Sequence, residues 1–249
     1  MKNAIKPIIA AAALAALQAC APAPNAETIA PTSAPRVSDA ISMDDLRFPL
    51  PGGEWREVYT HKIPGQSPSA PQTFKVYASV SGSVIDRVSI FWVQRKSTYK
   101  DLWRQYQSCL TTAEPEVHHA VITHNEGGPN PTRNPRLDCW HVRTLSMGRA
   151  GGAHPVIEAL HVFAQREGLI MPATMIGARF AQKRLSDRRE YAEYLWNPDV
   201  LSPNPGNIWT PGDWTAEAAK ADPARKIVVD RIKRWGEAWR ANLLSNNLS

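Results

Sequence analysis

Residues 74–94 read FKVYASVSGSVIDRVSIFWVQ, and their pattern decides the fold class. The first half alternates apolar side chains with mostly polar ones: Phe74, Val76, Ala78 and Val80 against Lys75, Tyr77 and Ser79. A period of two predicts a strand with one buried and one solvated face. Gly82-Ser83 suits a two-residue hairpin turn. The returning segment 84–94 is apolar on both faces at its far end, so we expect it near the centre of a sheet.

The rest of the chain supplies further strands and helices around this hairpin. Apolar or alternating runs predict strands at 54–63, 117–124, 137–146, 175–183 and 189–196. Helical periodicity and capping residues predict helices at 98–110, 155–166, 213–221 and from 223 onward. The expected fold is α+β: an antiparallel sheet of about six or seven strands, with helices packed on one side and an amphipathic C-terminal helix.

The C-terminal helix carries the clearest helical pattern. Asp222 can cap its start, with Pro223 at the first helical position. Its apolar stripe consists of Val228, Ile232, Trp235, Trp239 and Leu243. A basic amphipathic helix of this kind packs either on the domain's own sheet or on a membrane surface. Core packing is favoured, because two tryptophans are costly to leave in water.

The first twenty residues have the layout of an export signal. Lys2 and Lys6 precede an apolar run from Ile8 to Leu17 that is too short to span a membrane. The run ends in Leu17-Gln18-Ala19-Cys20, which resembles the lipobox of bacterial lipoproteins. The resemblance implies cleavage before Cys20 and lipidation of that cysteine, and Ala21 implies retention at the periplasmic face of the outer membrane. The alternative is cleavage that leaves Cys20 unmodified.

Three regions are therefore expected. Residues 1–19 form a lipoprotein signal peptide, residues 20–46 a lipidated Pro/Ala-rich tether, and residues 47–249 a single globular α+β domain. Nine tryptophans and a hydrophobic fraction of 43% are sufficient for a core in that domain. The formal net charge of +6, part of which leaves with the signal peptide, is too low for a nucleic-acid partner.

Two cysteines remain once Cys20 carries lipid. In an oxidising compartment, Cys109 and Cys139 are predicted to form a disulfide. Closing this loop stabilises a fold by about 3–4 kcal/mol on the chain-entropy estimate. The alternative, a reactive thiol pair, requires a close spacing or a basic setting that the sequence does not show.

Candidate catalytic and metal-binding residues do not converge in the sequence. His118 and His124 are about 20 Å apart on a strand, too far to share a zinc ion. His154, Glu158 and His161 share a helix face, but it lies away from the apolar stripe and is expected to be solvated. No metal or cofactor is expected.

Two short motifs in the sequence have simpler interpretations than a catalytic or anion-binding site. Ser97-Thr98-Tyr99-Lys100 matches the S-x-x-K of penicillin-recognising enzymes but lacks the companion motifs S-D-N and K-T-G. Residues 148–152 are glycine-rich and precede a helix, which permits an anion-binding nest. They lack the phosphate-loop residues, so a hinge is the favoured interpretation.

Tryptophans concentrate in the last quarter of the chain, and two of them flank a Pro-Gly turn. Trp209 and Trp214 are the candidate partner-binding residues if they are exposed, because tryptophan is enriched at binding hot spots. If they are buried, they anchor the loop on the core.

Two hypotheses of function follow. The first is a non-enzymatic protein-binding, assembly or immunity module, tethered to the membrane by its N-terminal lipid and acting on a protein partner in the cell envelope. The second is a cell-envelope hydrolase acting on peptidoglycan or lipid, which requires two carboxylates, or a histidine with a carboxylate, in one cleft.

Overall fold

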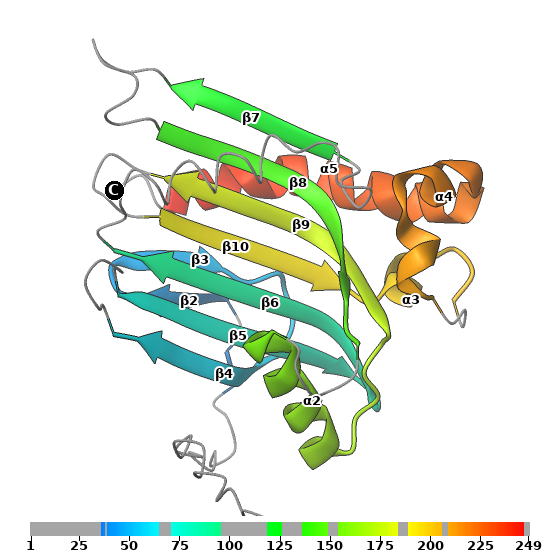
Figure 1. Ribbon diagram of the computed structural model, residues 1–249, viewed down its shortest axis with the longest axis horizontal. Helices are drawn as coiled ribbons and strands as arrows, with labels where there is room; N and C mark the ends of the chain where they lie inside the picture. Colours follow the sequence, from blue (N-terminus) through cyan, green and yellow to red (C-terminus); the bar gives the residue numbers. More distant parts are fainter. Residues whose placement is uncertain are drawn as a thin grey trace, which may run out of the picture. The chain divides into compact units, whose positions relative to one another are not determined.

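The computed structural model describes residues 36–37, 39–64, 71–95, 119–125, 136–148, 154–183, 189–205 and 209–246 (Figure 1). The contacts between residues group the chain into two compact units, Met1–Ser33 and Ala34–Ser249. Every described residue belongs to the second unit. The predictions for the signal peptide, Cys20, the helix at 98–110 and Cys109 lie outside the described residues. In the described part of the chain, no helix combines the length and apolar character needed to cross a membrane.

An antiparallel sheet of eight strands forms the body of the described unit. Its order is β1 (Arg36–Val37), β4 (Trp55–Ile63), β5 (Gln72–Ser81), β6 (Val84–Gln94), β10 (Arg189–Trp196), β9 (Thr174–Lys183), β8 (Arg136–Ser146) and β7 (His119–Asn125). The α+β prediction is confirmed. The sheet has one strand more than the expected maximum of seven, and the two-residue β1 is the additional strand.

The hairpin of residues 74–94 lies in the middle of this sheet. Gly82 has a φ of 59°, the left-handed conformation that its turn requires. β6 pairs with β5 on one side and β10 on the other, which confirms its central position. One detail differs: Tyr77 and Ser79 are buried rather than solvated. Tyr77 belongs to a core that also includes Phe48 from a second, two-stranded sheet.

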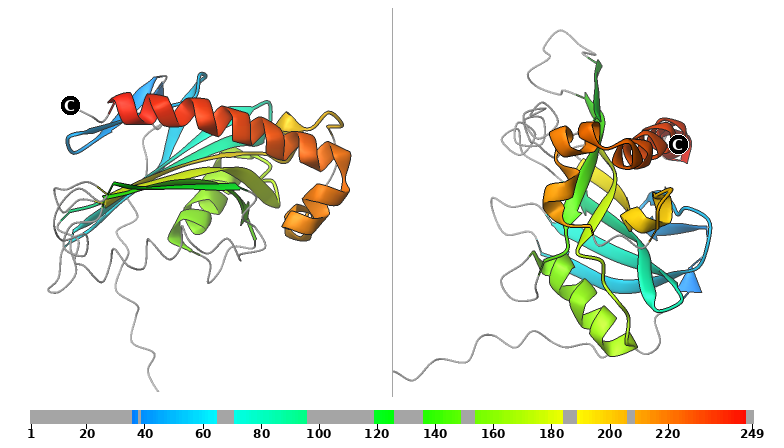
Figure 2. Two further views of the ribbon diagram at one scale, coloured as in Figure 1. Left: turned by 90° about the horizontal axis from the view of Figure 1, so that it is seen from above. Right: turned by 90° about the vertical axis from the view of Figure 1, so that its right-hand side faces the viewer.

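Helices cover both faces of the large sheet (Figure 2). α5 (Pro223–Asn246) packs on one face, where Val228 shares a core with Tyr194 of β10. α2 (Pro155–Glu167) packs on the other face through Leu160. The prediction placed the helices on one side. The structure differs because the central strands are apolar on both faces, and each apolar face must be covered.

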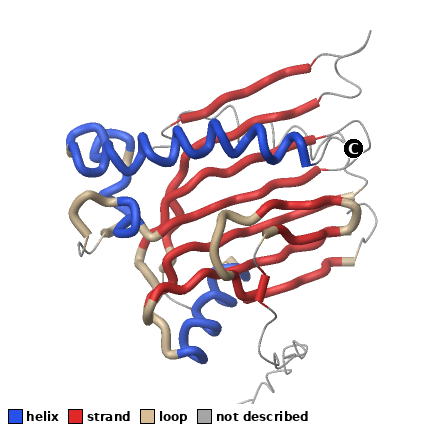
Figure 3. The backbone as a smooth tube through the Cα atoms, turned by 180° about the vertical axis from the view of Figure 1, so that it is seen from behind, coloured by secondary structure: helices blue, strands red, loops and turns tan. Residues whose placement is uncertain are grey.

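The globular unit begins before residue 47. β2 (Ala40–Met43) and β3 (Leu46–Pro49) form an antiparallel hairpin around Asp44, which has a φ of 57°. This hairpin lies beside α5 on the same side of the large sheet (Figure 3). Ile41 and Met43 are buried, so the range 20–46 expected as tether includes a core strand. The sequence signal was alternation of apolar residues on both sides of the Asp44-Asp45 turn.

The expected capping and stripe of α5 are confirmed. The Asp222 side chain accepts hydrogen bonds from the backbone N–H groups of Ala224 and Arg225, at 2.8 and 3.3 Å. The stripe is buried or partly buried against the core: Val228, Ile232, Trp235, Trp239 and Leu243. Gly236 allows a close approach to the sheet, since a Cβ there would lie 2.5 Å from the ring of Trp140.

Three short helices precede α5: α3 (Pro198–Leu201), η1 (Pro211–Trp214) and α4 (Ala216–Ala221). The prediction placed one helix here, capped by Asp213. Asp213 instead accepts hydrogen bonds from the backbone and hydroxyl of Thr210 at the start of η1. Thr215 caps α4, because its hydroxyl accepts from the backbone N–H of Ala218. The single predicted helix is therefore two helices with separate caps.

Candidate functional site

The two candidate partner-binding tryptophans are buried. Trp209 is 8% exposed and Trp214 is 0% exposed, and their ring centres are 5.0 Å apart. The indole N–H of Trp209 donates a hydrogen bond of 2.6 Å to Asp199. The pair anchors its loop on the core, so the two tryptophans do not form an exposed surface for a partner.

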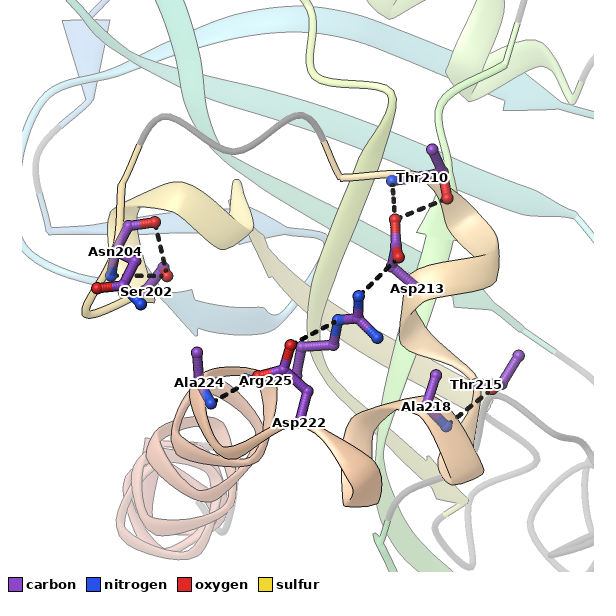
Figure 4. A network of polar contacts seen from close by, with 9 residues as sticks. All are labelled: Ser202, Asn204, Thr210, Asp213, Thr215, Ala218, Asp222, Ala224 and Arg225. Carbon is purple, nitrogen blue, oxygen red and sulfur yellow. Dashed lines mark hydrogen bonds and ion pairs between the residues drawn. The ribbon is translucent and has the colours of Figure 1, made fainter.

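Polar contacts around these tryptophans join η1, α4 and the start of α5 (Figure 4). Arg225 is at their centre, with its guanidinium 2.8 Å from Asp213 and 3.6 Å from Asp222. The same guanidinium lies over the ring of Trp209, 5.7 Å from its centre. Two carboxylates compensate this arginine, so we interpret the network as structural.

His154, Glu158 and His161 lie along α2 as expected but do not form a common site. His154 is exposed, and its Nδ1 accepts a hydrogen bond from the backbone at the start of the helix. The Nε2 atom of His161 contacts the carbonyl oxygens of Met147 and Gly148. Among the described residues, no group of three His, Cys, Asp or Glu side chains could hold a metal ion.

The predicted disulfide involves one described residue. Cys139 lies on β8 and is buried. Cys109 is outside the described residues, so the bond stays a prediction, as does lipidation of Cys20. The S-x-x-K motif and residues 149–152 are likewise outside the described ranges.

A polar cluster that the sequence did not reveal lies on three adjacent strands, β8, β9 and β10 (Figure 1). We name it the sheet-face cluster, and it comprises His141, Arg143, Arg179, Tyr191 and Glu193. Glu193, Arg179 and His141 are successive cross-strand partners in one row. Tyr191 packs against the core under α2, and residues two apart on a strand share a face. The cluster therefore occupies the face opposite α5.

The two arginines of this cluster have different partners. The Nε atom of Arg143 is 3.4 Å from a carboxylate oxygen of Glu193, whose side chain is 6% exposed. The guanidinium carbon of Arg179 lies over the ring of Tyr191, 4.3 Å from its centre. Within the described part of the chain, the Arg179 guanidinium makes no hydrogen bond or ion pair.

Burial and neighbouring charges keep His141 neutral. His141 is only 7% exposed. Burial, and then the positive charges of Arg179 and Arg143, lower the pKa of His141 to about 3. Burial also raises the pKa of Tyr191 to about 12, so its phenol stays protonated. At neutral pH the cluster therefore contains two cations, one carboxylate and two neutral polar side chains.

An aromatic row extends from the cluster toward β5. Tyr191 stacks on Trp92 with ring centres 5.2 Å apart, and Trp92 is 6.2 Å from Phe74. Together with Arg179, these side chains form a continuous strip across β9, β10, β6 and β5. Trp92 is 8% exposed and Tyr191 packs against the core, so the accessible parts of the strip are its half-buried ends, Phe74 and Arg179.

No protein-family model, curated protein or solved structure matches this chain. The chemistry of the cluster therefore follows from its own residues. A general acid or base is most effective when its pKa lies near the working pH, and the pKa of His141 is far below that range. Glu193 is paired with Arg143. The arrangement is better suited to holding a ligand than to transferring protons.

The sequence contained a partial signal for this cluster. His141 and Arg143 are two residues apart on one predicted strand, and Tyr191 and Glu193 are two residues apart on another. Such i, i+2 pairs share a face of their strand. The order of strands and their register, which bring Arg179 between the two pairs, could not be obtained from the spacing alone.

Proposed function

We propose that this chain is a lipid-anchored protein on the periplasmic face of the outer membrane, where it acts as a non-enzymatic binding or assembly module. The motif Leu17-Gln18-Ala19-Cys20 supports the address. The binding role rests on Arg179, a half-buried cation in an aromatic strip, without a counter-ion among the described residues. Arginine and stacked aromatic rings are the side chains most enriched at binding hot spots.

The partner is a protein of the cell envelope in this proposal. An accessory role in an envelope machine and neutralisation of a periplasmic toxin both require a rigid recognition surface rather than a catalytic centre. The sheet-face cluster meets that requirement, because its side chains are carried by paired strands rather than by loops.

The second candidate, a cell-envelope hydrolase, has one observation in its favour: His141 and Glu193 belong to the same cluster. It is less well supported, because Arg179 lies between them in the cross-strand row. The low pKa of His141 also makes the imidazole a weak base.

Site-specific photo-crosslinking in the native envelope tests the binding proposal. A photoreactive phenylalanine analogue at Phe74, at the end of the aromatic strip, is expected to capture a specific protein. The matched position is Ile227, an exposed residue on α5 on the opposite face, where no capture is expected. The capture at Phe74 is expected to weaken when Arg179 is replaced by Gln.

Two outcomes would overturn the proposal. One is no specific product from Phe74. The other is the same set of products from Phe74 and Ile227, which would indicate contact without recognition. Turnover of purified peptidoglycan or lipid, lost in a Glu193→Gln variant, would favour the hydrolase instead.

A further inference from the structure

Two polar groups of the sheet-face cluster lack partners in the described part of the chain. His141 is 7% exposed, and its imidazole makes no hydrogen bond there. The guanidinium of Arg179 is half-buried and makes no hydrogen bond or ion pair there. Among the described residues, the fully enclosed side-chain nitrogen and oxygen atoms without a hydrogen bond do not include those of His141 or Arg179. The N–H donors of both side chains are therefore accessible to a ligand.

The other half-buried arginines in the described part of the chain have polar partners. Arg225 is paired with Asp213 and Asp222. Arg87 donates hydrogen bonds to Ser79 and to the carbonyl oxygen of Gly52. Arg179 differs, because the nearest carboxylate in its cluster, Glu193, is paired with Arg143. The cluster thus retains one positive charge that no carboxylate of its own balances.

The geometry of Arg179 leaves its hydrogen-bonding edges available. Its guanidinium lies over the Tyr191 ring, which occupies one face of the plane. The N–H groups of a guanidinium point outward in that plane and match the two oxygens of a carboxylate or phosphate. His141 is the cross-strand neighbour of Arg179 and, being neutral, has one ring N–H to donate.

We infer that Arg179 and His141 form a binding site for an oxyanion, a phosphate or a carboxylate group, on the sheet face opposite α5. The inference rests on the proposed binding function and specifies the chemical group of the partner that this surface recognises. The anion accepts hydrogen bonds from the guanidinium edge and from the imidazole N–H, and it balances the unpaired charge. Tyr191 and Trp92 form the apolar floor beside it.

Titration of the full chain in detergent with two probes, inorganic phosphate and acetate, tests this site. The readout is the histidine ring NMR spectrum, in which the His141 resonances are identified by their loss in a His141→Asn variant. Either probe is expected to move those resonances saturably. It is also expected to raise the pKa of His141, because an adjacent anion favours the protonated ring. The probe that binds with the higher affinity shows whether the partner's recognised group is a phosphate or a carboxylate.

Two substitutions at Arg179 and one control separate a bound anion from a general charge effect. Arg179→Gln is expected to weaken binding at least tenfold. Arg179→Lys keeps the charge and much of the side chain but cannot form the bidentate hydrogen bonds of a guanidinium. It is expected to weaken anion binding less than Arg179→Gln does. Arg234→Gln removes the same charge from an exposed position on α5 and is expected to leave the affinity unchanged.

The inference is overturned if neither probe moves the His141 resonances saturably, or if Arg179→Gln binds as tightly as Arg234→Gln. These results are distinct from a failure of the proposed function. Capture from Phe74 that persists without anion binding would leave a binding module with a different recognition chemistry. Anion binding without any capture would leave the site and remove the protein partner.

Discussion

A buried histidine near two arginines makes stability depend on pH. The pKa of His141 is about 3 in the folded chain, against an ordinary value of 6.5. Between these values the unfolded chain binds a proton that the folded chain does not, so the free energy of unfolding rises with pH in this window. The contribution is complete above about pH 6.5 and is lost as the pH falls toward 3. Its size is a few kcal/mol, since one pKa unit corresponds to about 1.4 kcal/mol.

Replacing His141 by Asn is therefore expected to reduce the loss of unfolding free energy in acid, compared with the native chain. Urea unfolding at about pH 7 and about pH 4.5 measures the difference. The variant is expected to lose less free energy of unfolding between the two pH values than the native chain. Among the described residues, the charges that act on His141 are those of Arg179 and Arg143, and the neighbouring Glu193 and Tyr191 belong to the same cluster; all four are the same in both proteins. His61→Asn, at an exposed position on β4, serves as the control. An identical pH dependence in all three proteins would contradict the assignment.

The cap of α5 decides where the longest helix starts. Asp222→Ala removes an acceptor for the backbone N–H groups of Ala224 and Arg225, and it also removes one of the two carboxylates that face Arg225. The variant is expected to lose about 1–2 kcal/mol of stability in denaturant unfolding. Asp222→Asn retains the capping oxygen and is expected to lose less. Equal losses in the two variants would show that the charge, rather than the cap, is responsible.

The contact between α5 and the sheet depends on a residue without a side chain. Alanine normally stabilises a helix relative to glycine by about 1 kcal/mol. At position 236 its Cβ would lie 2.5 Å from the Trp140 ring, so Gly236→Ala is expected to destabilise the protein by about 1–3 kcal/mol. Gly52→Ala, where no atom lies within 4 Å, is the control. A rise in the unfolding midpoint of Gly236→Ala would contradict the close packing.

At the scale of elements, the sequence predicted most strands and helices because their patterns are local. The hairpin at 74–94, the strand pair β9–β10 and the capped α5 all follow from periodicity, turn residues and caps. Burial of Tyr77 did not follow, because the elements that cover it, β2, β3 and α5, are distant in the sequence. Placement of α2 on the opposite face also depended on which strands became central. Both are consequences of packing between remote segments, which a local pattern does not contain.

At the scale of the molecule, the candidate site arises from topology. Residues 141, 179 and 193 become neighbours only because β9 lies between β8 and β10. The tryptophan pair at 209 and 214 is the opposite case. It is conspicuous in the sequence, and yet it supports the core, because an aromatic-rich turn can pack inward as readily as outward. Candidate sites in a chain of this kind are thus better sought among polar residues that share a sheet face than among prominent aromatic motifs.

In the proposed function, the N-terminal lipid determines where this surface operates, and its effect can be measured separately from folding. Contacts divide Met1–Ser33 from Ala34–Ser249, so loss of the lipid is not expected to alter the stability of the globular unit. Cys20→Ser predicts a chain without the acyl modification and with an unchanged urea midpoint. Ser33→Ala, outside the lipobox, is expected to keep the acyl modification. Mass spectrometry of the native protein is expected to find acyl chains on Cys20. A native chain with an unmodified Cys20 in the soluble fraction would contradict the anchor and the proposed site of action, while the proposal of an oxyanion site at the sheet-face cluster would stand.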